Sequence, residues 1–468
     1  MKRVLRAYKK TVSIVDEAAT DLYAGLAGDG IGFLLESYDK NNGRYSFLGT
    51  KPEAIVTSKG QSLIIRGEEG CEILEGNPME QLKRFYDRFE VHKDDGELAF
   101  TGGLVGSLGY DFVRYSEVLP EENPDEIGIE TIQLMLVTKF IVIDHVAETL
   151  TGVCLDEDTS EGRIRGCREA EALISKARRC GRKEEVSFYR DGKIVHKSDS
   201  LSQYSEKVKK IQEYIREGHI FQTVLSQRWT IETGQTGFEL YKELRVLNPS
   251  PYLYYFQFGD FEIIGSSPEM LVKQTDRRIS TCPIAGTRRR GRDEKEDQQL
   301  REELLRDEKE RAEHVMLVDL ARNDMGRICE FGTVKVTQFM EVQPYSHVMH
   351  IVSLVEGRRK RGYHPVDLAV SFLPAGTLSG APKIRAMEII EELEDVRRGL
   401  YGGATGYIDF NGNIDFCITI RTMIKKGNRV YLQAGAGIVA DSVPEMEYQE
   451  CCNKVMALAK TLVEEEEL

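Results

Sequence analysis

Long hydrophobic runs are missing from this 468-residue sequence. Even residues 134–142 are interrupted by Lys139, and they are far fewer than the ~18 apolar residues that a transmembrane helix needs. The basic N-terminus leads into a polar segment rather than into the continuous apolar core of a secretory signal. We therefore expect no membrane association and a cytoplasmic location.

Paired cysteine motifs and an excess of positive charge are also missing. The nine cysteines show no CxxC spacing and no clustering with histidine, which argues against a disulfide framework and against a zinc site. The formal net charge is −14, whereas a nucleic-acid-binding protein needs a basic footprint. The basic segment 288–292 runs straight into the acidic segment 293–297, so we interpret it as a solvated loop and expect no nucleic-acid partner.

Nucleotide-binding motifs are absent from the two glycine-rich segments. Residues 377–383 lack the Gly-Lys-Ser/Thr ending of a phosphate loop, and residues 434–438 lack the GxGxxG spacing of a dinucleotide site. The small residues Gly435, Ala436 and Gly437 would still let backbone N–H groups approach an anion. Close packing is the equally simple alternative.

The hydrophobic pattern predicts an α+β fold with antiparallel sheets. Short apolar runs up to about residue 147 indicate strands, and the charged, glycine-punctuated segment 156–200 indicates a connection. We place a boundary near residue 185, between an N-terminal region (1–185) and a second domain (186–468). There the pattern predicts helices over 201–215, 298–322 and 442–463, with hairpins at 251–265 and 406–421.

Two pairs of glutamates are spaced to share a helical face. A capping box at residues 442–445 would open a helix bearing Glu447, Glu450 and Lys454, and an earlier predicted helix bears Glu310 and Glu313. Together the four carboxylates could hold a hard divalent cation. In a chain with 77 acidic residues, chance pairs on solvated faces are the competing interpretation.

Several polar residues lie singly on or next to apolar stretches, where they could be catalytic or merely buried and hydrogen-bonded. They are Gln222, Glu269, His350, Tyr401 and Arg421. Composition does not choose between these roles.

Read together, these segments resemble the chorismate-utilising enzyme family, and within it the anthranilate synthase component I sequences. The matching strings lie at residues 220–228, 265–269, 283–288, 313–324, 374–383 and 434–439, in the family's order. The resemblance implies that family's fold, large antiparallel β-sheets flanked by helices, with an associated N-terminal regulatory region. It also implies a reaction in which chorismate and ammonia form 2-amino-2-deoxyisochorismate, which then loses pyruvate to give anthranilate.

Carried over by position, the resemblance implies a Mg²⁺ site and a carboxylate-binding site. Glu313 and Glu450 would bind Mg²⁺ directly, and Glu310 and Glu447 would hold its waters. The residues implied to bind or line the substrate are Gly286, Thr287, Tyr401, Arg421, Gly435, Ala436, Gly437 and Lys454. A divalent cation would also offset the charge of a dianionic substrate entering an acidic protein.

The resemblance also implies the catalytic residues. Glu269 matches the general acid that protonates the departing ring hydroxyl, and such a carboxyl should have a raised pKa. His350 matches the histidine associated with pyruvate elimination, and Thr377 matches a hydroxyl beside it.

Two positions distinguish the relatives. Members that add water to chorismate carry a lysine base where this chain has Gln222, and an amide suits ammonia as its own nucleophile. Aminodeoxychorismate synthases typically carry a nucleophilic lysine where this chain has Ala285. The alternatives that remain are an aminodeoxychorismate synthase component I, a relative that retains its pyruvyl group, and a non-catalytic tryptophan-binding regulatory relative.

Regulation and ammonia supply are implied in the same way. Two segments resemble the halves of the family's tryptophan inhibitor pocket, with candidate residues Glu36, Ser37, Pro251, Tyr252 and Leu253. Glu36 would meet the ligand's ammonium group, although residues 34–37 could also be only a strand and a turn. No cysteine lies in the nucleophile-elbow context of a glutaminase, so we expect ammonia either free or from a glutamine amidotransferase subunit (component II).

Overall fold

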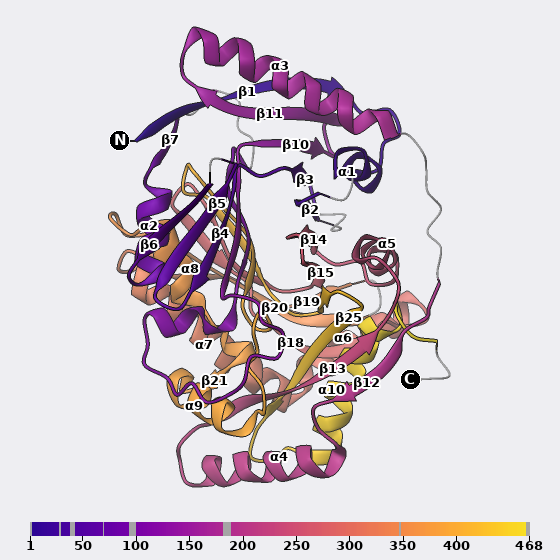
Figure 1. Ribbon diagram of the computed structural model, residues 1–468. Helices are drawn as coiled ribbons and strands as arrows, with labels where there is room; N and C mark the ends of the chain where they lie inside the picture. The colour runs from indigo at the N-terminus through magenta and orange to yellow at the C-terminus, as the bar shows by residue number, and fades with distance from the viewer. Residues whose placement is uncertain are drawn as a thin grey trace.

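Two large β-sheets flanked by helices form the structure, a computed structural model that describes residues 2–27, 30–37, 43–68, 70–92, 100–180, 189–345 and 348–464 (Figure 1). All strand pairs are antiparallel within this part of the chain except β1 with β7, which are parallel. The predicted α+β class with large antiparallel sheets is confirmed.

The helices are α1 (Ala19–Ala27), α2 (Pro78–Tyr86), α3 (Ser160–Ala177), α4 (Leu201–Arg216), α5 (Gly237–Leu247), α6 (Glu294–Arg306), α7 (Glu308–Ile328), α8 (Pro365–Phe372), α9 (Lys383–Leu393) and α10 (Pro444–Ala459), with 3₁₀ turns η1 (Tyr110–Tyr115), η2 (Arg178–Cys180) and η3 (Gly376–Leu378). Helices α3 and α4 lie at opposite ends of the molecule in Figure 1.

The first sheet has the order β12-β13-β25-β24-β15-β14-β2-β3-β10-β11-β1-β7, and β21 also pairs with β13. Its strands are β12 (Lys193–Lys197), β13 (Gln222–Glu232), β25 (Arg429–Ile438), β24 (Thr422–Lys426), β15 (Phe261–Ser267), β14 (Tyr252–Gln257), β2 (Gly32–Glu36), β3 (Tyr45–Thr50), β10 (Lys139–Asp144), β11 (Thr149–Glu157), β1 (Arg3–Ser13), β7 (Phe89–His92) and β21 (Gly380–Ala381).

The second sheet has the order β18-β20-β17-β16-β23-β22-β8-β9-β4-β5-β6, and β19 also pairs with β20. Its strands are β18 (Ile284–Arg289), β20 (Val348–Arg358), β17 (Arg278–Thr281), β16 (Met270–Thr275), β23 (Ile414–Ile418), β22 (Ala404–Asp409), β8 (Gly103–Leu108), β9 (Ile132–Val137), β4 (Ala54–Lys59), β5 (Ser62–Gly67), β6 (Gly70–Glu75) and β19 (Lys335–Pro344).

Both sheets take strands from both sides of the predicted boundary. Strand β14 pairs with β2 in the first sheet, and β22 pairs with β8 in the second, with Gly406 opposite Gly106. A Cβ atom at Gly406 would lie 1.9 Å from the carbonyl oxygen of Asp415, so only glycine permits this approach of the backbones. The boundary itself, near residue 185, falls in residues 181–188, outside the described residues.

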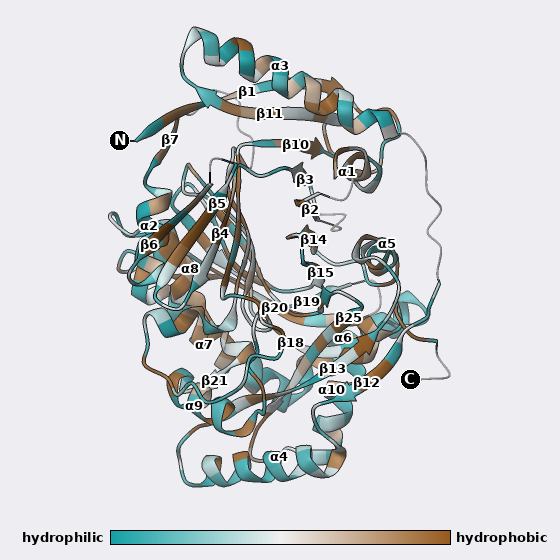
Figure 2. Ribbon diagram, viewed as in Figure 1, coloured by the Kyte–Doolittle hydropathy of each residue, from teal (hydrophilic) through white to brown (hydrophobic). Residues whose placement is uncertain are grey.

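Burial explains where the helices lie. In α4 the residues Tyr204, Val208 and Ile211 are buried at helical spacing, while most of the remaining side chains of this helix are exposed or half-buried. Strand β13 is buried along nearly its whole length because α9, α10 and α4 pack on it. Figure 2 shows the same division, with hydrophobic residues concentrated in the strands and hydrophilic ones on the outer helices.

The local predictions agree with the structure at several turns and fail at two helix starts. The helix over 201–215 and both hairpins are confirmed. The predicted helix over 298–322 is two helices, because the chain breaks at Asp307, whose side chain caps α7. The capping box at 442–445 is wrong, because α10 begins at Pro444 after Val443, and the Ser442 hydroxyl instead accepts a hydrogen bond from the Val439 N–H group.

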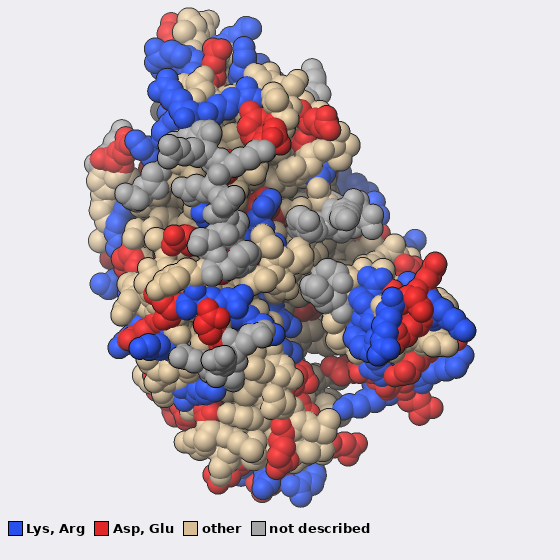
Figure 3. Space-filling model, turned by 90° about the vertical axis from the view of Figure 1, so that its right-hand side faces the viewer, with Lys and Arg blue, Asp and Glu red and all other residues tan. Residues whose placement is uncertain are grey.

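Among the described helices, none is long and apolar enough to cross a membrane. On the face drawn in Figure 3, Lys and Arg side chains are interspersed with Asp and Glu side chains.

Candidate active site

Glu269 and Thr377 meet at a small cavity, and both residues are half-buried. Glu269 lies between β15 and β16, and Thr377 lies in η3, where its hydroxyl donates a hydrogen bond to Glu269 Oε1 at 3.2 Å. Both residues line a cavity of about 40 Å³ with apolar walls that include Leu317 and Phe372. Burial raises the pKa of Glu269 to about 8, against the lowering effects of the Thr377 hydrogen bond and the positive charge of Lys454. Glu269 is therefore protonated at neutral pH and can act as a proton donor.

His350 lies on β20 beside the strand that carries Gly286 and Thr287. Its Nδ1 atom is 2.9 Å from the Gly286 carbonyl oxygen and 3.1 Å from the Thr287 hydroxyl oxygen. Burial lowers the pKa of His350, and the positive charge of Arg421 adds to that effect. Because a carbonyl can only accept, Nδ1 carries the ring hydrogen, which leaves Nε2 as the basic nitrogen of a neutral imidazole.

Gly286 lets helix α7 approach this strand. Its φ angle is +66°, and a Cβ atom there would lie 3.0 Å from a Leu304 methyl carbon and 3.2 Å from Glu310 Oε2. The neighbouring Arg288 forms an ion pair with Glu310 at 3.4 Å. The strand bearing Thr287 and the helix bearing the first glutamate pair are thus held together.

Lys454 connects α10 to the small-residue segment of β25. Its ammonium group donates to the Gly435 carbonyl oxygen at 2.8 Å and forms an ion pair with Glu450 at 2.7 Å. Arg421 reaches the Lys454 carbonyl oxygen at 3.5 Å, and a Cβ atom at Gly435 would lie 3.0 Å from the Tyr401 hydroxyl oxygen. Four of the predicted carboxylate-binding residues are therefore neighbours.

Gln222 faces the same segment of β25 from the start of β13. It is buried, and a Cβ atom at Gly437 would lie 2.6 Å from its Nε2 atom. Ala436, on the same segment, pairs with Leu225 across the ladder. The amide of Gln222 therefore borders the predicted carboxylate site rather than bulk solvent.

The four predicted metal ligands influence one another electrostatically. Burial raises the pKa of Glu313 and of Glu447, and the negative charges of Glu310 and Glu450 add to the rise for Glu313. Glu450 is exposed and is paired with Lys454. Within the described residues, no three His, Cys, Asp or Glu side chains stand close enough together to hold a metal ion. An oxygen-only set with mutually repelling charges suits a hard divalent cation, so the residues fit Mg²⁺, and their role as ligands stays a prediction.

The five predicted inhibitor residues line a second, larger cavity. Glu36, Ser37, Pro251, Tyr252 and Leu253 all border a cavity of about 470 Å³, within the ~300–1,000 Å³ range of small-molecule pockets. Its other walls include the aromatic residues Tyr45, Phe47, Tyr254, Tyr345 and Tyr407.

One oxygen of Glu36 in this second cavity, Oε2, already has two partners. Glu36 accepts a hydrogen bond from the Tyr241 hydroxyl at 2.6 Å and forms an ion pair with Arg245 at 3.0 Å. The cavity shares Met270 and Cys282 with the cavity at Glu269. A wall made of these two residues therefore lies between the two sites.

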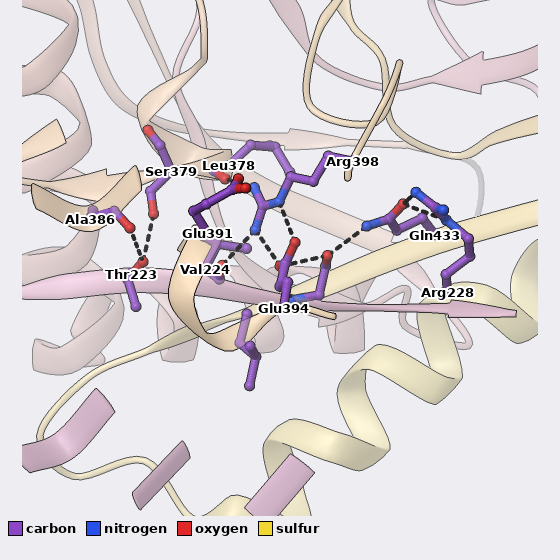
Figure 4. Close-up of polar contacts among 12 residues, drawn as sticks. Thr223, Val224, Arg228, Leu378, Ser379, Ala386, Glu391, Glu394, Arg398 and Gln433 are labelled. Atoms are coloured by element: carbon purple, nitrogen blue, oxygen red, sulfur yellow. Dashed lines mark hydrogen bonds and ion pairs between the residues drawn. The ribbon is translucent and has the colours of Figure 1, made fainter. Parts of the chain in front are cut away.

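Sequence reasoning missed one buried ion pair next to the candidate site. Arg398 and Glu394 are only 3 % and 5 % exposed, and Figure 4 shows Arg398 bonded to Leu378, which follows Thr377. Arg398 also lies against the ring of Tyr401. In the sequence they belong to the charged stretch 391–398, which is typical of a solvated surface. No pattern in that stretch distinguishes the buried charges from exposed ones.

Comparisons with known proteins identify the family to which this chain belongs. Residues 33–460 match the family described as chorismate binding enzyme. The chain is 47 % identical over 448 residues to anthranilate synthase component 1 of Acetivibrio thermocellus, covering 93 % of this chain and 91 % of that protein. It is 44 % identical over 467 residues to the protein of the same name from Thermus thermophilus, covering 99 % and 98 %.

Solved structures show the same fold. The crystal structure of anthranilate synthase component I from Streptococcus pneumoniae has a TM-score of 0.78 and 37 % identity, covering 90 % of this chain and 93 % of that one. The isochorismate synthase MenF of Escherichia coli, at 20 % identity, has a TM-score of 0.74 and covers 98 % and 95 %. The chain belongs to the chorismate-binding enzyme family, as the sequence motifs predicted, and within it is similar to the component I proteins of anthranilate synthase.

Proposed function

We propose that this chain converts chorismate and ammonia to anthranilate and pyruvate, as the large subunit of an anthranilate synthase. The observation that carries the proposal is the half-buried Glu269 carboxyl, bonded to Thr377 and with a pKa raised to about 8 by desolvation. Loss of the ring hydroxyl of chorismate requires a proton donor, and Glu269 provides one. Attack of ammonia forms a C–N bond, the C–O bond to the hydroxyl breaks, and the Glu269 proton leaves with that oxygen as water.

The second half of the reaction needs a base. Loss of pyruvate breaks the ether C–O bond and removes a ring proton, which yields the aromatic product. His350 supports this step because its lowered pKa keeps the imidazole neutral, so that Nε2 is unprotonated and can accept a proton. This arrangement favours the full reaction over that of a relative that retains its pyruvyl group.

Substrate binding is assigned to the residues around Lys454. The side-chain carboxylate of chorismate needs cationic or N–H partners, and Lys454, Arg421, the Tyr401 hydroxyl and the backbone N–H groups around Ala436 and Gly437 would supply them. Mg²⁺ held by Glu313 and Glu450, with waters on Glu310 and Glu447, would supply positive charge at the other carboxylate. In the structure Glu450 is paired with Lys454, so the cation would share this carboxylate with the lysine or compete with it.

Ammonia is the proposed nucleophile because no lysine stands at either discriminating position. Gln222 is an amide with no basic nitrogen, and Ala285 is a buried methyl group on β18. Neither residue activates water or forms a covalent amine intermediate. The ammonia would come from a glutamine amidotransferase subunit, component II, consistent with the numbered component names of the relatives.

Feedback inhibition by tryptophan is proposed for the 470 Å³ cavity. Its aromatic walls suit an indole ring, and Glu36 offers a carboxylate for the ammonium group. This assignment places the enzyme at the first step of tryptophan biosynthesis.

The experiment is a product analysis. The purified chain is incubated with chorismate, Mg²⁺ and ammonium, and products are identified by fluorescence and mass spectrometry with and without tryptophan. Anthranilate and pyruvate in equal amounts, suppressed by tryptophan and by removal of Mg²⁺ with a chelator, are the expected result. An aminated product that keeps its pyruvyl group, or tryptophan binding without turnover, would refute the proposal.

A further inference from the structure

We propose that Arg398, held by Glu394, is a positioning residue that fixes the backbone of the proposed active site. The inference rests on the proposed function only for the identity of the reaction. Arg398 Nη2 donates to Glu394 Oε1 at 2.6 Å and Arg398 Nε donates to Glu394 Oε2 at 2.9 Å (Figure 4). The pair is bidentate and almost completely buried, so its geometry is tightly specified.

The rest of the guanidinium holds two segments that carry candidate catalytic residues. Nη1 donates to the Leu378 carbonyl oxygen at 2.5 Å, directly after Thr377. Nη2 donates to the Val224 carbonyl oxygen at 2.7 Å, two residues after Gln222. One planar group therefore fixes the distance between η3 and β13.

Glu394 extends the same network to β25. Its Oε1 atom accepts hydrogen bonds from the Ser226 N–H group at 2.8 Å and from the Ser226 hydroxyl at 2.7 Å. Gln433 donates to that hydroxyl at 2.8 Å, and Ser226 pairs with Gly435 across the ladder. Glu394 therefore stabilises the position of the Gly435 segment through Ser226 and Gln433.

Arg398 also packs against the ring of Tyr401. Its guanidinium carbon lies 5.6 Å from the centre of that ring and 4.8 Å from the centre of the Tyr110 ring. Both tyrosines are buried, and the pKa of each hydroxyl is raised by that burial. The cation therefore sets the position of Tyr401 through a desolvated contact.

A role in stability alone does not account for this arrangement. Burying two charges costs desolvation energy that their attraction only partly offsets, and apolar residues of similar volume often stabilise a protein as well. Unlike apolar packing, the directional hydrogen bonds of this pair fix the relative positions of three segments, those of Leu378, Val224 and Glu394. Misplacement by about 1 Å costs an enzyme roughly a hundredfold in rate.

The chain offers a matched control in Arg114. This arginine is 13 % exposed, forms ion pairs with Asp111 and Glu391 at 2.7 Å each, and donates to the Leu119 carbonyl oxygen at 3.2 Å. It thus resembles Arg398 in bonding, although Arg114 is half-buried and Arg398 is fully buried. None of these partners lies next to a candidate site residue.

The test compares Arg398→Lys with Arg114→Lys. Lysine keeps the charge but cannot form the fork of hydrogen bonds. We expect Arg398→Lys to lower kcat between about tenfold and about a hundredfold, and Arg114→Lys to leave kcat within about twofold, at similar losses of Tm. Hydrogen exchange should become faster in Arg398→Lys at the Val224 and Ser226 amides, and the fluorescence of buried Trp229 verifies folding.

Equal effects of the two variants on kcat, or unchanged exchange at both amides, would overturn the inference. If Arg398→Lys does not fold, Glu394→Gln replaces it, because glutamine keeps the shape while removing the charge. In that variant the same fall in kcat supports the inference and an unchanged kcat refutes it. A wild-type chain that makes no anthranilate would refute the proposed function, whereas the exchange measurement would still decide the positioning role.

Discussion

The pKa of Glu269 makes a prediction about pH that can be worked through from the structure. An ordinary glutamic acid, with a pKa of 4.5, is about 0.3 % protonated at pH 7, whereas a group with a pKa of about 8 is about 90 % protonated. Burial thus increases the fraction of proton donor about three-hundredfold at neutral pH. The chemical step should therefore be constant up to about pH 7 and should fall about tenfold per pH unit above about pH 8.

The assay must separate this effect from the supply of ammonia. Ammonium loses its proton as pH rises, so the rate should be measured at a fixed concentration of unprotonated ammonia, with saturating chorismate and Mg²⁺. Glu269→Gln serves as the comparison, because it keeps a side-chain oxygen for Thr377 but has no proton to give. A rate that does not fall between pH 7 and 9.5, or a Glu269→Gln variant with wild-type activity, would refute the role of Glu269.

Stability gives an independent measurement of the same group. Between pH 4.5 and about pH 8 the folded protein keeps the Glu269 proton while the unfolded chain loses it, so the free energy of unfolding falls as pH rises through this window. Below pH 4.5 both states are protonated and the effect vanishes. Glu269→Gln removes the penalty, so its Tm relative to wild type should rise from pH 5 to pH 9. A constant difference would show that the carboxyl is not buried in solution.

Three further substitutions test the other assignments. Glu450→Gln should raise the Mg²⁺ concentration needed for half-maximal activity by at least about tenfold. Its Tm should stay nearly unchanged, because this side chain is exposed. A wild-type Mg²⁺ titration would contradict the role of Glu450 as a ligand. Glu36→Gln should raise the half-inhibitory tryptophan concentration by about tenfold or more without changing kcat. Unchanged inhibition would show that tryptophan does not bind at Glu36. His350→Asn should leave amination faster than pyruvate loss, so an aminated intermediate accumulates; an equal slowing of both steps refutes its role as base.

The elements that were predictable from sequence are those determined by local periodicity. The apolar spacing of α4 and the hairpin of β22 and β23 depend on neighbours in the chain, and both are present. The turn of that hairpin differs from the expected two-residue Asn-Gly form, because Gly412 has positive φ whereas Asn411 does not, and the Gly412 N–H group donates to the Asp409 carbonyl oxygen. The break between α6 and α7 was missed because Asp307 caps the second helix without interrupting the helical pattern of charges. The failed capping box shows the same limit, since Ser442 bonds to Val439 rather than to the helix it precedes.

Arrangement in space was not predictable from the residues themselves. The continuity of both sheets across residue 185 depends on the pairing of β14 with β2 and of β22 with β8, which nothing local specifies. The predicted catalytic and inhibitor residues came from the family motifs, and the structure adds that Glu269 and Thr377 line one cavity while the five inhibitor residues line another. Desolvation then makes Glu269 a proton donor at neutral pH, since the same carboxyl in water would be ionised.

Arg398 shows most clearly why motif reasoning stops short of a complete site. A residue that touches substrate tends to lie in a recognisable string, but one that holds such residues in place acts through backbone carbonyls, which any sequence provides. Its partners, the carbonyl groups of Val224 and Leu378, lie 174 and 20 positions away along the chain. Only the folded structure brings them to one guanidinium, and the cost of burying that charge is the physical reason to expect a purpose for it.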